Sequence, residues 1–163
     1  MRVPDPAAHE PIDISLPDPA ATAHLAQRLA AVARPGDLIA LHGTLGMGKT
    51  EFARAFIRHL AGLEEEVPSP TFTLVQSYDT PAGTIWHFDL YRLTRAEDVW
   101  ELGLEDALAD GITLIEWPDR LGSTLPARRL DLSLRAGDGP AARHALLDAL
   151  GGSDLLDRLA APP

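Results

Sequence analysis

The sequence contains no cysteine, and this absence excludes several kinds of chemistry. Without a thiol the chain cannot form a disulfide, a thiolate metal site or a cysteine nucleophile. Long apolar runs are also absent, because no stretch approaches the roughly 18 apolar residues of a membrane-spanning helix. The first residues, MRVPDPAAHEP, lack the apolar centre of a signal peptide. We therefore expect a cytoplasmic protein that makes no contact with a membrane.

Positive charge is scarce. The chain carries 14 Lys and Arg against 24 Asp and Glu, which gives a formal net charge of −10. Nonspecific binding to nucleic acid depends on clustered basic side chains that neutralise phosphates. If RNA is involved, we therefore expect contact to be indirect, through another protein that holds it. Lysine occurs once, as Lys49, and arginine supplies every other fixed positive charge.

The length and composition favour one α/β domain. A chain of 163 residues with 45% hydrophobic and 23% charged residues suits a single globular core. Short apolar or alternating runs predict strands at 12–16, 37–41, 71–75, 84–90, 112–116 and 130–134. Helical periodicity predicts helices at 21–33, 51–63 and 96–109. We divide the chain into a flexible arm at 1–11, one domain at 12–150 and a peripheral tail at 151–163.

Local signals refine three of these elements. Asp18 is suited to capping the first helix, with Pro19 at the first helical position. The turn residues at 80–83 favour a hairpin between the strands at 71–75 and 84–90. Residues 141–150 are ambiguous, because they either pair with 130–134 across the Gly-rich segment 137–140 or form a final helix.

A glycine-rich segment, HGTLGMGKT at residues 42–50, lies between a predicted strand and a predicted helix. Gly43, Gly48, Lys49 and Thr50 satisfy the phosphate-binding pattern G-x-x-x-x-G-K-[ST]. Glycines allow successive backbone N–H groups to point into one concavity, where an anion can sit. Lys49 would reach the outer phosphates and Thr50 would ligate magnesium, while the start of the helix adds its positive dipole end. The segment predicts a nucleotide site.

Two acids are candidates for the chemistry of a magnesium-dependent nucleotide hydrolase. Asp89 lies in the apolar strand at 84–90 and Glu116 ends the strand at 112–116, and strand ends beside the phosphate loop are where an open α/β sheet places such groups. Either acid can orient a magnesium-bound water or the attacking water. The alternative for each is a strand-end cap or a surface salt bridge.

Other polar residues carry weaker signals. Ser69, Pro70 and Thr71 form a stiffened loop that either senses the γ-phosphate, as switch loops do, or is a proline turn entering a strand. Arg92 is a candidate charge stabiliser, with a surface salt bridge as the alternative. The histidines have no metal-ligand spacing, so we interpret His42, His87 and His144 as structural.

Five motifs together resemble the bacterial TsaE family, also called YjeE. They are GTLGMGKT, SPTFTLV, HFDLYRL, ELGLEDAL and LIEWPDRL, in this order and at compatible spacings over about residues 12–150. The resemblance implies a P-loop NTPase-like three-layer sandwich with a mostly parallel central sheet and antiparallel additions. It also implies an ATPase needed for making threonylcarbamoyladenosine on tRNA, acting with the TsaB and TsaD proteins.

The resemblance carries roles onto individual positions. It implies a magnesium role for Thr50 and Glu116, a functional role for Asp89, and a switch-like loop at 69–71. It implies that ATP is bound by Leu45, Gly46, Met47, Gly48, Lys49 and Thr50, with Thr22 and Arg143 near the nucleotide. Two positions depart from the family pattern: Thr44 replaces the usual Asp, and Glu51 replaces a common second Thr. Neither departure removes a required ligand.

Three functions remain open from the sequence. The first is a magnesium-dependent ATPase, with Lys49, Asp89 and Glu116 as catalytic residues, that acts on a TsaB–TsaD complex in tRNA N6-threonylcarbamoyladenosine modification. The second is a small P-loop kinase that phosphorylates a metabolite, although no arginine-rich lid segment is evident. The third is an ATP-gated binding subunit with negligible hydrolysis of its own. No arginine finger is evident in the chain, so we expect weak hydrolysis that partners stimulate.

Overall fold

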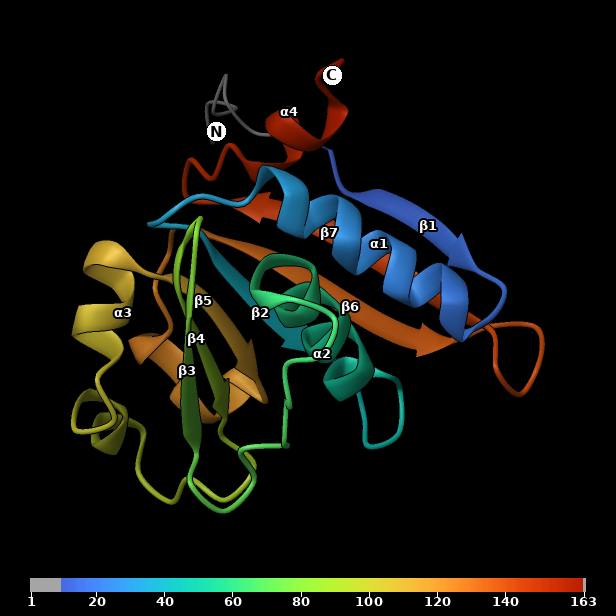
Figure 1. Ribbon diagram of the computed structural model, residues 1–163. Coiled ribbons are helices and arrows are strands. Elements are labelled where there is room, and N and C mark those ends of the chain that lie inside the picture. Colours follow the sequence, from blue (N-terminus) through green and yellow to red (C-terminus); the bar gives the residue numbers. More distant parts are fainter. Residues whose placement is uncertain (1–9, 163) are drawn as a thin grey trace, which may run out of the picture.

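The centre of the protein is a seven-stranded sheet with the strand order β1-β7-β6-β2-β5-β4-β3 (Figure 1). The structure is a computed structural model, and it describes residues 10–162. Strands β6, β2, β5 and β4 are parallel, whereas β1, β7 and β3 pair antiparallel towards the two edges. The strands β1 to β7 span Ile12–Leu16, Leu38–His42, Val75–Thr80, Gly83–Asp89, Ile112–Glu116, Arg129–Ala136 and Arg143–Leu150. The predicted mostly parallel sheet with antiparallel additions is confirmed.

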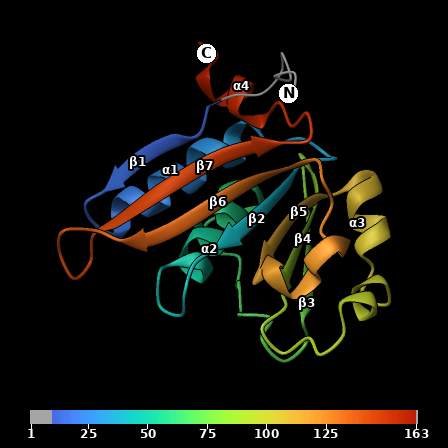
Figure 2. The same ribbon diagram turned by 180° about the vertical axis from the view of Figure 1, so that it is seen from behind.

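Helices cover both faces of this sheet, so the domain has three layers (Figures 1 and 2). One face carries α1 (Pro19–Val32) and α2 (Lys49–Ala61). The other carries α3 (Leu104–Asp110) with two 3-10 turns, η1 (Ala96–Trp100) and η2 (Pro118–Thr124). As predicted, Asp18 caps α1 and its side chain accepts a hydrogen bond from the backbone N–H of Ala21 at 2.8 Å.

Alternation along the strands divides the apolar side chains between two cores. In β2, Ile39 and Leu41 join the core beneath α1 and α2, whereas Leu38 joins the core beneath α3. In β5, Leu114 and Ile115 divide in the same way. Strands buried on both faces therefore appear in the sequence as continuous apolar runs, as is typical of parallel sheets.

The strand predicted at 71–75 begins only at Val75, so this prediction was largely wrong. Residues 70–74 instead form a closed turn, in which the N–H of Leu74 donates to the carbonyl of Pro70 at 2.6 Å. Leu74 has a φ of +67°, a left-handed conformation that cannot continue a strand. The neighbouring hairpin of β3 and β4 is confirmed.

The helix predicted at 96–109 is divided into η1 and α3, which is a second correction. The break lies at Gly103, whose φ of +95° is outside the helical region. A Cβ at this position would approach the ring of Trp86 to 3.0 Å, so the close approach also favours glycine. Helical periodicity gave no warning, because Val99 and Leu104 are buried on both sides of the break.

The structure decides between strand and helix for residues 141–150 and shows a helix in the tail that follows. Residues 143–150 form β7, so the predicted hairpin with β6 is confirmed and the competing helix is excluded. The tail at 151–163, expected to be peripheral, contains α4 (Leu155–Ala160). Leu155 and Leu156 are buried in the core beside α1, because the six-residue helix turns its apolar face inward.

Two further observations concern the ends of the chain and its helices. Most of the arm predicted at 1–11 lies outside the described residues, which begin at Glu10. Among residues 10–162, no helix has both the length and the apolar character needed to cross a lipid bilayer.

Candidate active site

The glycine-rich segment forms the loop that joins β2 to α2, with α2 beginning at Lys49. Gly43, Gly46 and Gly48 have φ values of +149°, +83° and +101°. Residues other than glycine rarely adopt such backbone conformations. A Cβ on Gly43 would also lie 2.8 Å from the carbonyl oxygen of Leu134 in β6. The loop is thus shaped by its glycines and by close contact with the neighbouring strand.

Lys49 is buried at the start of α2, with 5% of its surface exposed. Its ammonium donates a hydrogen bond to the carbonyl of Gly43, and Nζ lies 3.4 Å from the centre of the Trp117 ring. Burial lowers the pKa of Lys49, and the negative charges of Glu116, Asp89 and Asp119 partly oppose this effect. The chain's one lysine is therefore held between the loop, an aromatic face and acidic side chains.

Strand register brings the two predicted acids together. Asp89 and Glu116 are paired positions at the carboxyl ends of the parallel strands β4 and β5. Glu116 alternates with Leu114 and Ile112 in β5, so it faces α2, and its Oε1 accepts a hydrogen bond from the Thr50 hydroxyl at 2.9 Å. This contact brings together Thr50 and Glu116, which are two of the predicted magnesium ligands.

Asp89 contacts the loop that was predicted to act as a switch. Its Oδ2 accepts a hydrogen bond from the Thr71 hydroxyl at 3.2 Å, and its Oδ1 accepts one from the backbone N–H of Tyr91 at 3.1 Å. The hydroxyls of Ser69 and Thr71 are 2.7 Å apart, whereas Pro70 is buried. Residues 70–74 thus turn beside Asp89 instead of continuing as a strand.

His87 was interpreted as a structural histidine, but its position relative to the acids was missed. Its Nε2 is 2.7 Å from Oε2 of Glu116, and both side chains are almost fully buried, with 0% and 2% exposed. Its Nδ1 has no hydrogen-bond partner within the described residues. An ionised carboxylate only accepts hydrogen bonds, so Nε2 donates in a contact with the Glu116 carboxylate. The spacing of two residues between His87 and Asp89, which puts both on one face of β4, was the available signal.

The site residues divide between two cavities that share the phosphate loop. One cavity contains the predicted Lys49, Thr50, Asp89 and Glu116, and sequence reasoning missed two aromatic members of its wall, Tyr91 and Trp117. Its full lining is Leu45, Gly46, Gly48, Lys49, Thr50, Glu51, Ser69, Thr71, Asp89, Tyr91, Arg92, Glu116 and Trp117. The guanidinium of Arg92 lies 4.5 Å from the centre of the exposed Phe72 ring, and no carboxylate among residues 10–162 forms an ion pair with it.

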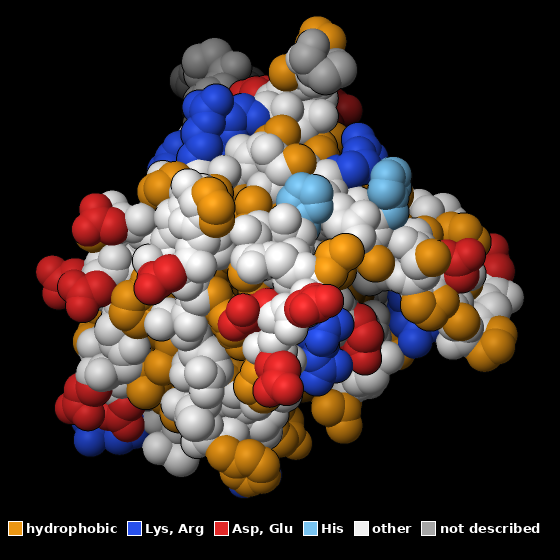
Figure 3. Space-filling view, in the orientation of Figure 1, with side chains coloured by type: hydrophobic (Ala, Val, Ile, Leu, Met, Phe, Trp, Pro, Cys, Tyr) orange, Lys and Arg blue, Asp and Glu red, His pale blue; other side chains and the backbone are white. Residues whose placement is uncertain are grey.

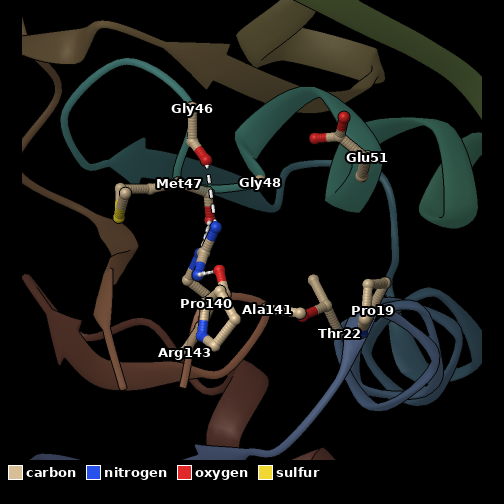
Figure 4. A pocket seen from close by; sticks show the side chains of 9 residues that line it. All are labelled: Pro19, Thr22, Gly46, Met47, Gly48, Glu51, Pro140, Ala141 and Arg143. Carbon is tan, nitrogen blue, oxygen red and sulfur yellow. Dashed lines mark hydrogen bonds between the residues drawn. The ribbon is translucent and has the colours of Figure 1, made fainter. Parts of the chain in front are cut away.

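The second cavity lies on the other side of the phosphate loop (Figure 4). Thr22 from α1 and Arg143 from β7 face it from opposite walls, and the phosphate loop, whose Met47 side chain points away, borders it on a third side (Figure 4). Its full lining is Pro19, Thr22, Gly46, Met47, Gly48, Glu51, Pro140, Ala141 and Arg143. Thr22 and Arg143, which are 121 positions apart in the sequence, are thus brought to one cavity beside the phosphate loop, and their place near a nucleotide stays a prediction.

The oxygen ligands at this site suit magnesium bound together with phosphates. Within the described residues, no group of three or more His, Cys, Asp or Glu side chains is arranged to hold a metal ion by itself. Magnesium, however, is usually held by one or two protein oxygens, with water and substrate phosphates completing its ligands. The adjacent Thr50 hydroxyl and Glu116 carboxylate provide such a pair beside the phosphate loop.

The parallel sheet and the glycine-rich loop between β2 and α2 define a protein with a P-loop NTPase-like fold. The sequence model of the family described as "Threonylcarbamoyl adenosine biosynthesis protein TsaE" matches residues 16–145. This match covers most of the chain. The chain belongs to the TsaE family.

Individual relatives agree with this assignment. The tRNA threonylcarbamoyladenosine biosynthesis protein TsaE of Rickettsia bellii is 43% identical over 117 residues, which are 72% of this chain and 81% of that protein. The protein of the same name from Bacillus subtilis is 37% identical over 123 residues, covering 74% and 76% of the two chains. The crystal structure of Bacillus subtilis YdiB matches with a TM-score of 0.76 at 30% identity, covering 93% of this chain and 95% of that one.

Proposed function

We propose that this chain is the ATP-binding and magnesium-dependent ATP-hydrolysing component of tRNA N6-threonylcarbamoyladenosine biosynthesis. The observation that carries the proposal is the convergence of Lys49, Thr50, Asp89 and Glu116 on one cavity beside the phosphate loop. These residues come from the loop end and from two neighbouring strand ends, so the fold itself assembles them. Membership of the TsaE family supports the biosynthetic context.

Binding of the triphosphate is assigned to the loop and to Lys49. The backbone N–H groups of residues 45–50 and the positive end of α2 would hold phosphate oxygens. Lys49 now donates to the carbonyl of Gly43, and on binding its ammonium would turn to the β- and γ-phosphates. Its place against Trp117 keeps this charge beside the cavity.

Hydrolysis is assigned to the acids. The Thr50 hydroxyl and the Glu116 carboxylate would hold magnesium, which supplies positive charge that stabilises the phosphates during transfer. Asp89 would orient the attacking water, since its two oxygens are already fixed by Thr71 and the N–H of Tyr91. The water oxygen would bond to the γ-phosphorus as the bond from the γ-phosphorus to the bridging oxygen breaks, giving ADP and phosphate, and the proton that the water loses would pass to the phosphate oxygens or to solvent.

Partner proteins complete the proposal. We propose TsaB and TsaD as partners, with tRNA contacted through their complex, because a net charge of −10 disfavours direct binding to a phosphate backbone. Figure 3 shows Asp and Glu side chains over the left and centre of one face of the protein. The loop at 69–74 borders the cavity and exposes 81% of the Phe72 side chain. Docking of a partner beside this loop would couple the order of the loop to the state of the nucleotide.

The test is ATP hydrolysis by the full chain with magnesium, measured alone and with TsaB and TsaD added. We expect weak turnover alone and stimulation by the partners, both abolished by Lys49→Ala. Asp89→Ala and Glu116→Ala should each lower kcat by about 100-fold or more, with a smaller effect on ATP affinity, because they act on water and metal. Arg95→Ala, which removes a cation from an exposed ion pair with Glu97, is the control and should behave as the wild type.

Two outcomes would contradict the proposal. Hydrolysis that survives in all three site variants would place the activity elsewhere or in a contaminant. Phosphate passed to a metabolite instead of water would retain the nucleotide site but assign the protein to the P-loop kinases.

A further inference from the structure

Arg143 at the start of β7 reaches across to the phosphate loop (Figure 4). Its Nε donates to the carbonyl of Met47 and its Nη2 to the carbonyl of Gly46, each at 3.3 Å. Its Nη1 donates to the carbonyls of Pro140 and Ala142, at 3.1 and 2.8 Å, in the turn between β6 and β7. One side chain thus joins two loops that are more than ninety positions apart in the sequence.

The phosphate loop has little internal support of its own. Between Gly43 and Gly48, the hydrogen bond within the loop backbone is the one from the N–H of Met47 to the carbonyl of Thr44, at 3.3 Å. The positive φ angles at its glycines are accessible to glycine but not enforced by it, so a free loop of this composition samples many shapes. Contacts from outside must therefore select the shape in which the N–H groups converge.

Arg143 is placed to make this selection. A guanidinium has five N–H donors, and four hydrogen bonds from Arg143 already go to backbone carbonyls. The carbonyls of Gly46 and Met47 belong to two successive peptide groups. The hydrogen bonds from Arg143 hold both carbonyls on the side of β7 and so fix the orientation of both peptide groups. Of their two N–H groups, that of Gly48 belongs to the proposed phosphate site, and that of Met47 is the one that donates to the carbonyl of Thr44.

We propose that Arg143 is a positioning residue that pins the phosphate loop to the β6–β7 hairpin and so prearranges the loop for phosphate. This inference rests on the proposed function in one respect, that the loop binds the nucleotide. Arg143 acts on the nucleotide through the carbonyls of Gly46 and Met47, and its own charge is not the principal attraction. Prearrangement raises affinity because the loop no longer loses conformational freedom on binding.

The experiment compares Arg143→Ala and Arg143→Lys with the wild-type full chain. Calorimetric titrations with ADP and with ATP, each with magnesium, measure affinity, and hydrogen exchange of the backbone at residues 44–48 measures the order of the nucleotide-free loop. Arg135→Ala is the matched control, because it removes a cation from the same hairpin whose partner, Asp13 at 2.9 Å, is remote from the loop. Thermal unfolding checks that each variant folds.

We expect both Arg143 variants to bind ADP and ATP about tenfold more weakly, since two hydrogen bonds to the loop are lost and a single ammonium cannot replace the guanidinium fork. Exchange at 44–48 should be faster in both variants and unchanged in Arg135→Ala. If Arg143→Ala does not fold, Arg143→Lys carries the test.

Two results would overturn the inference. Near-normal binding by Arg143→Lys, with a loss in Arg143→Ala that is greater for ATP than for ADP, would show that Arg143 acts as a charge on the phosphates. Unchanged exchange and unchanged affinity in both variants would show that it merely forms the cavity wall. If the wild type binds neither nucleotide, the proposed function fails, and the exchange measurement alone still decides whether Arg143 orders the loop.

Discussion

Replacement of His87 by leucine gives a sharp test of how the buried acid is held. Glu116 is 2% exposed, and its two oxygens are shared between Thr50 at 2.9 Å and His87 at 2.7 Å. A leucine leaves Oε2 buried without a partner, whereas Oε1 keeps its contact with Thr50. The substitution therefore changes one defined interaction of the carboxylate.

The expected loss of stability follows from the kind of hydrogen bond removed. Hydrogen bonds to charged groups contribute about 1.5 to 3 kcal/mol, so His87→Leu should lower the free energy of unfolding by about 2 kcal/mol. For a chain of this length, that loss corresponds to a decrease in Tm of about 4 to 8 °C. In a Glu116→Gln background no carboxylate is left unpaired, and the further cost of His87→Leu should fall to about 1 kcal/mol.

Urea unfolding of the four proteins, followed by tryptophan fluorescence, completes this double-mutant cycle. The two costs should differ by about 1 kcal/mol, which is the coupling between His87 and the charge of Glu116. Equal costs in the two backgrounds would refute the reasoning, because His87 would then contribute only packing. No cost in either background would show that Glu116 obtains water or another partner when His87 is absent.

Two further predictions concern polar side chains of the sheet, the fully buried Thr113 in β5 and the partly exposed Asp131 in β6, which contacts His42 at the end of β2. Thr113 is fully buried in β5, and its hydroxyl has no partner among the described residues. Thr113→Val should therefore raise the free energy of unfolding, measured with urea, by about 1 kcal/mol. A lower free energy of unfolding in the variant would show that the hydroxyl has a partner. Burial alone would raise the pKa of Asp131, but hydrogen bonds from His42 and Arg129 outweigh it and lower the pKa below its ordinary value. A lowered pKa stabilises the folded protein above the ordinary carboxyl pKa, and this contribution is lost as the pH falls through the folded value. Asp131→Asn should therefore be less stable than the wild type at pH 7, with a difference that shrinks below about pH 4; a difference independent of pH would contradict the assignment.

Much of the fold could be predicted because its signals are local. The pattern at Gly43, Gly48 and Lys49 indicated the loop between strand and helix, and Asp18 with Pro19 indicated the start of α1. The apolar run at 112–116 indicated a strand buried on both faces, and all five of its residues are buried. In each case the residues that carry the signal also make the local structure.

The errors arose where a distant contact overrides local preference. The β-branched and aromatic residues at 71–75 favour a strand, but the hydroxyl of Thr71 bonds to Asp89 and the chain turns. Gly103 interrupts a helical pattern with its φ of +95°, and Trp86 lies in the space beside it. Asp89 and Trp86 are distant in the sequence from the segments that they contact. A pattern that repeats every two to four residues could not include them.

The sequence by itself determined the type of most main elements, the place of the phosphate loop and the acids Asp89 and Glu116 as candidates, because these depend on residue type and short spacing. Only the tertiary structure decided how the candidates are arranged. Parallel register aligned Asp89 with Glu116, the face of β5 turned Glu116 to Thr50, and the hairpin brought Arg143 to the loop carbonyls. These contacts join residues that are 27 to 97 positions apart, and they depend on strand pairing across the whole sheet, which no local pattern specifies.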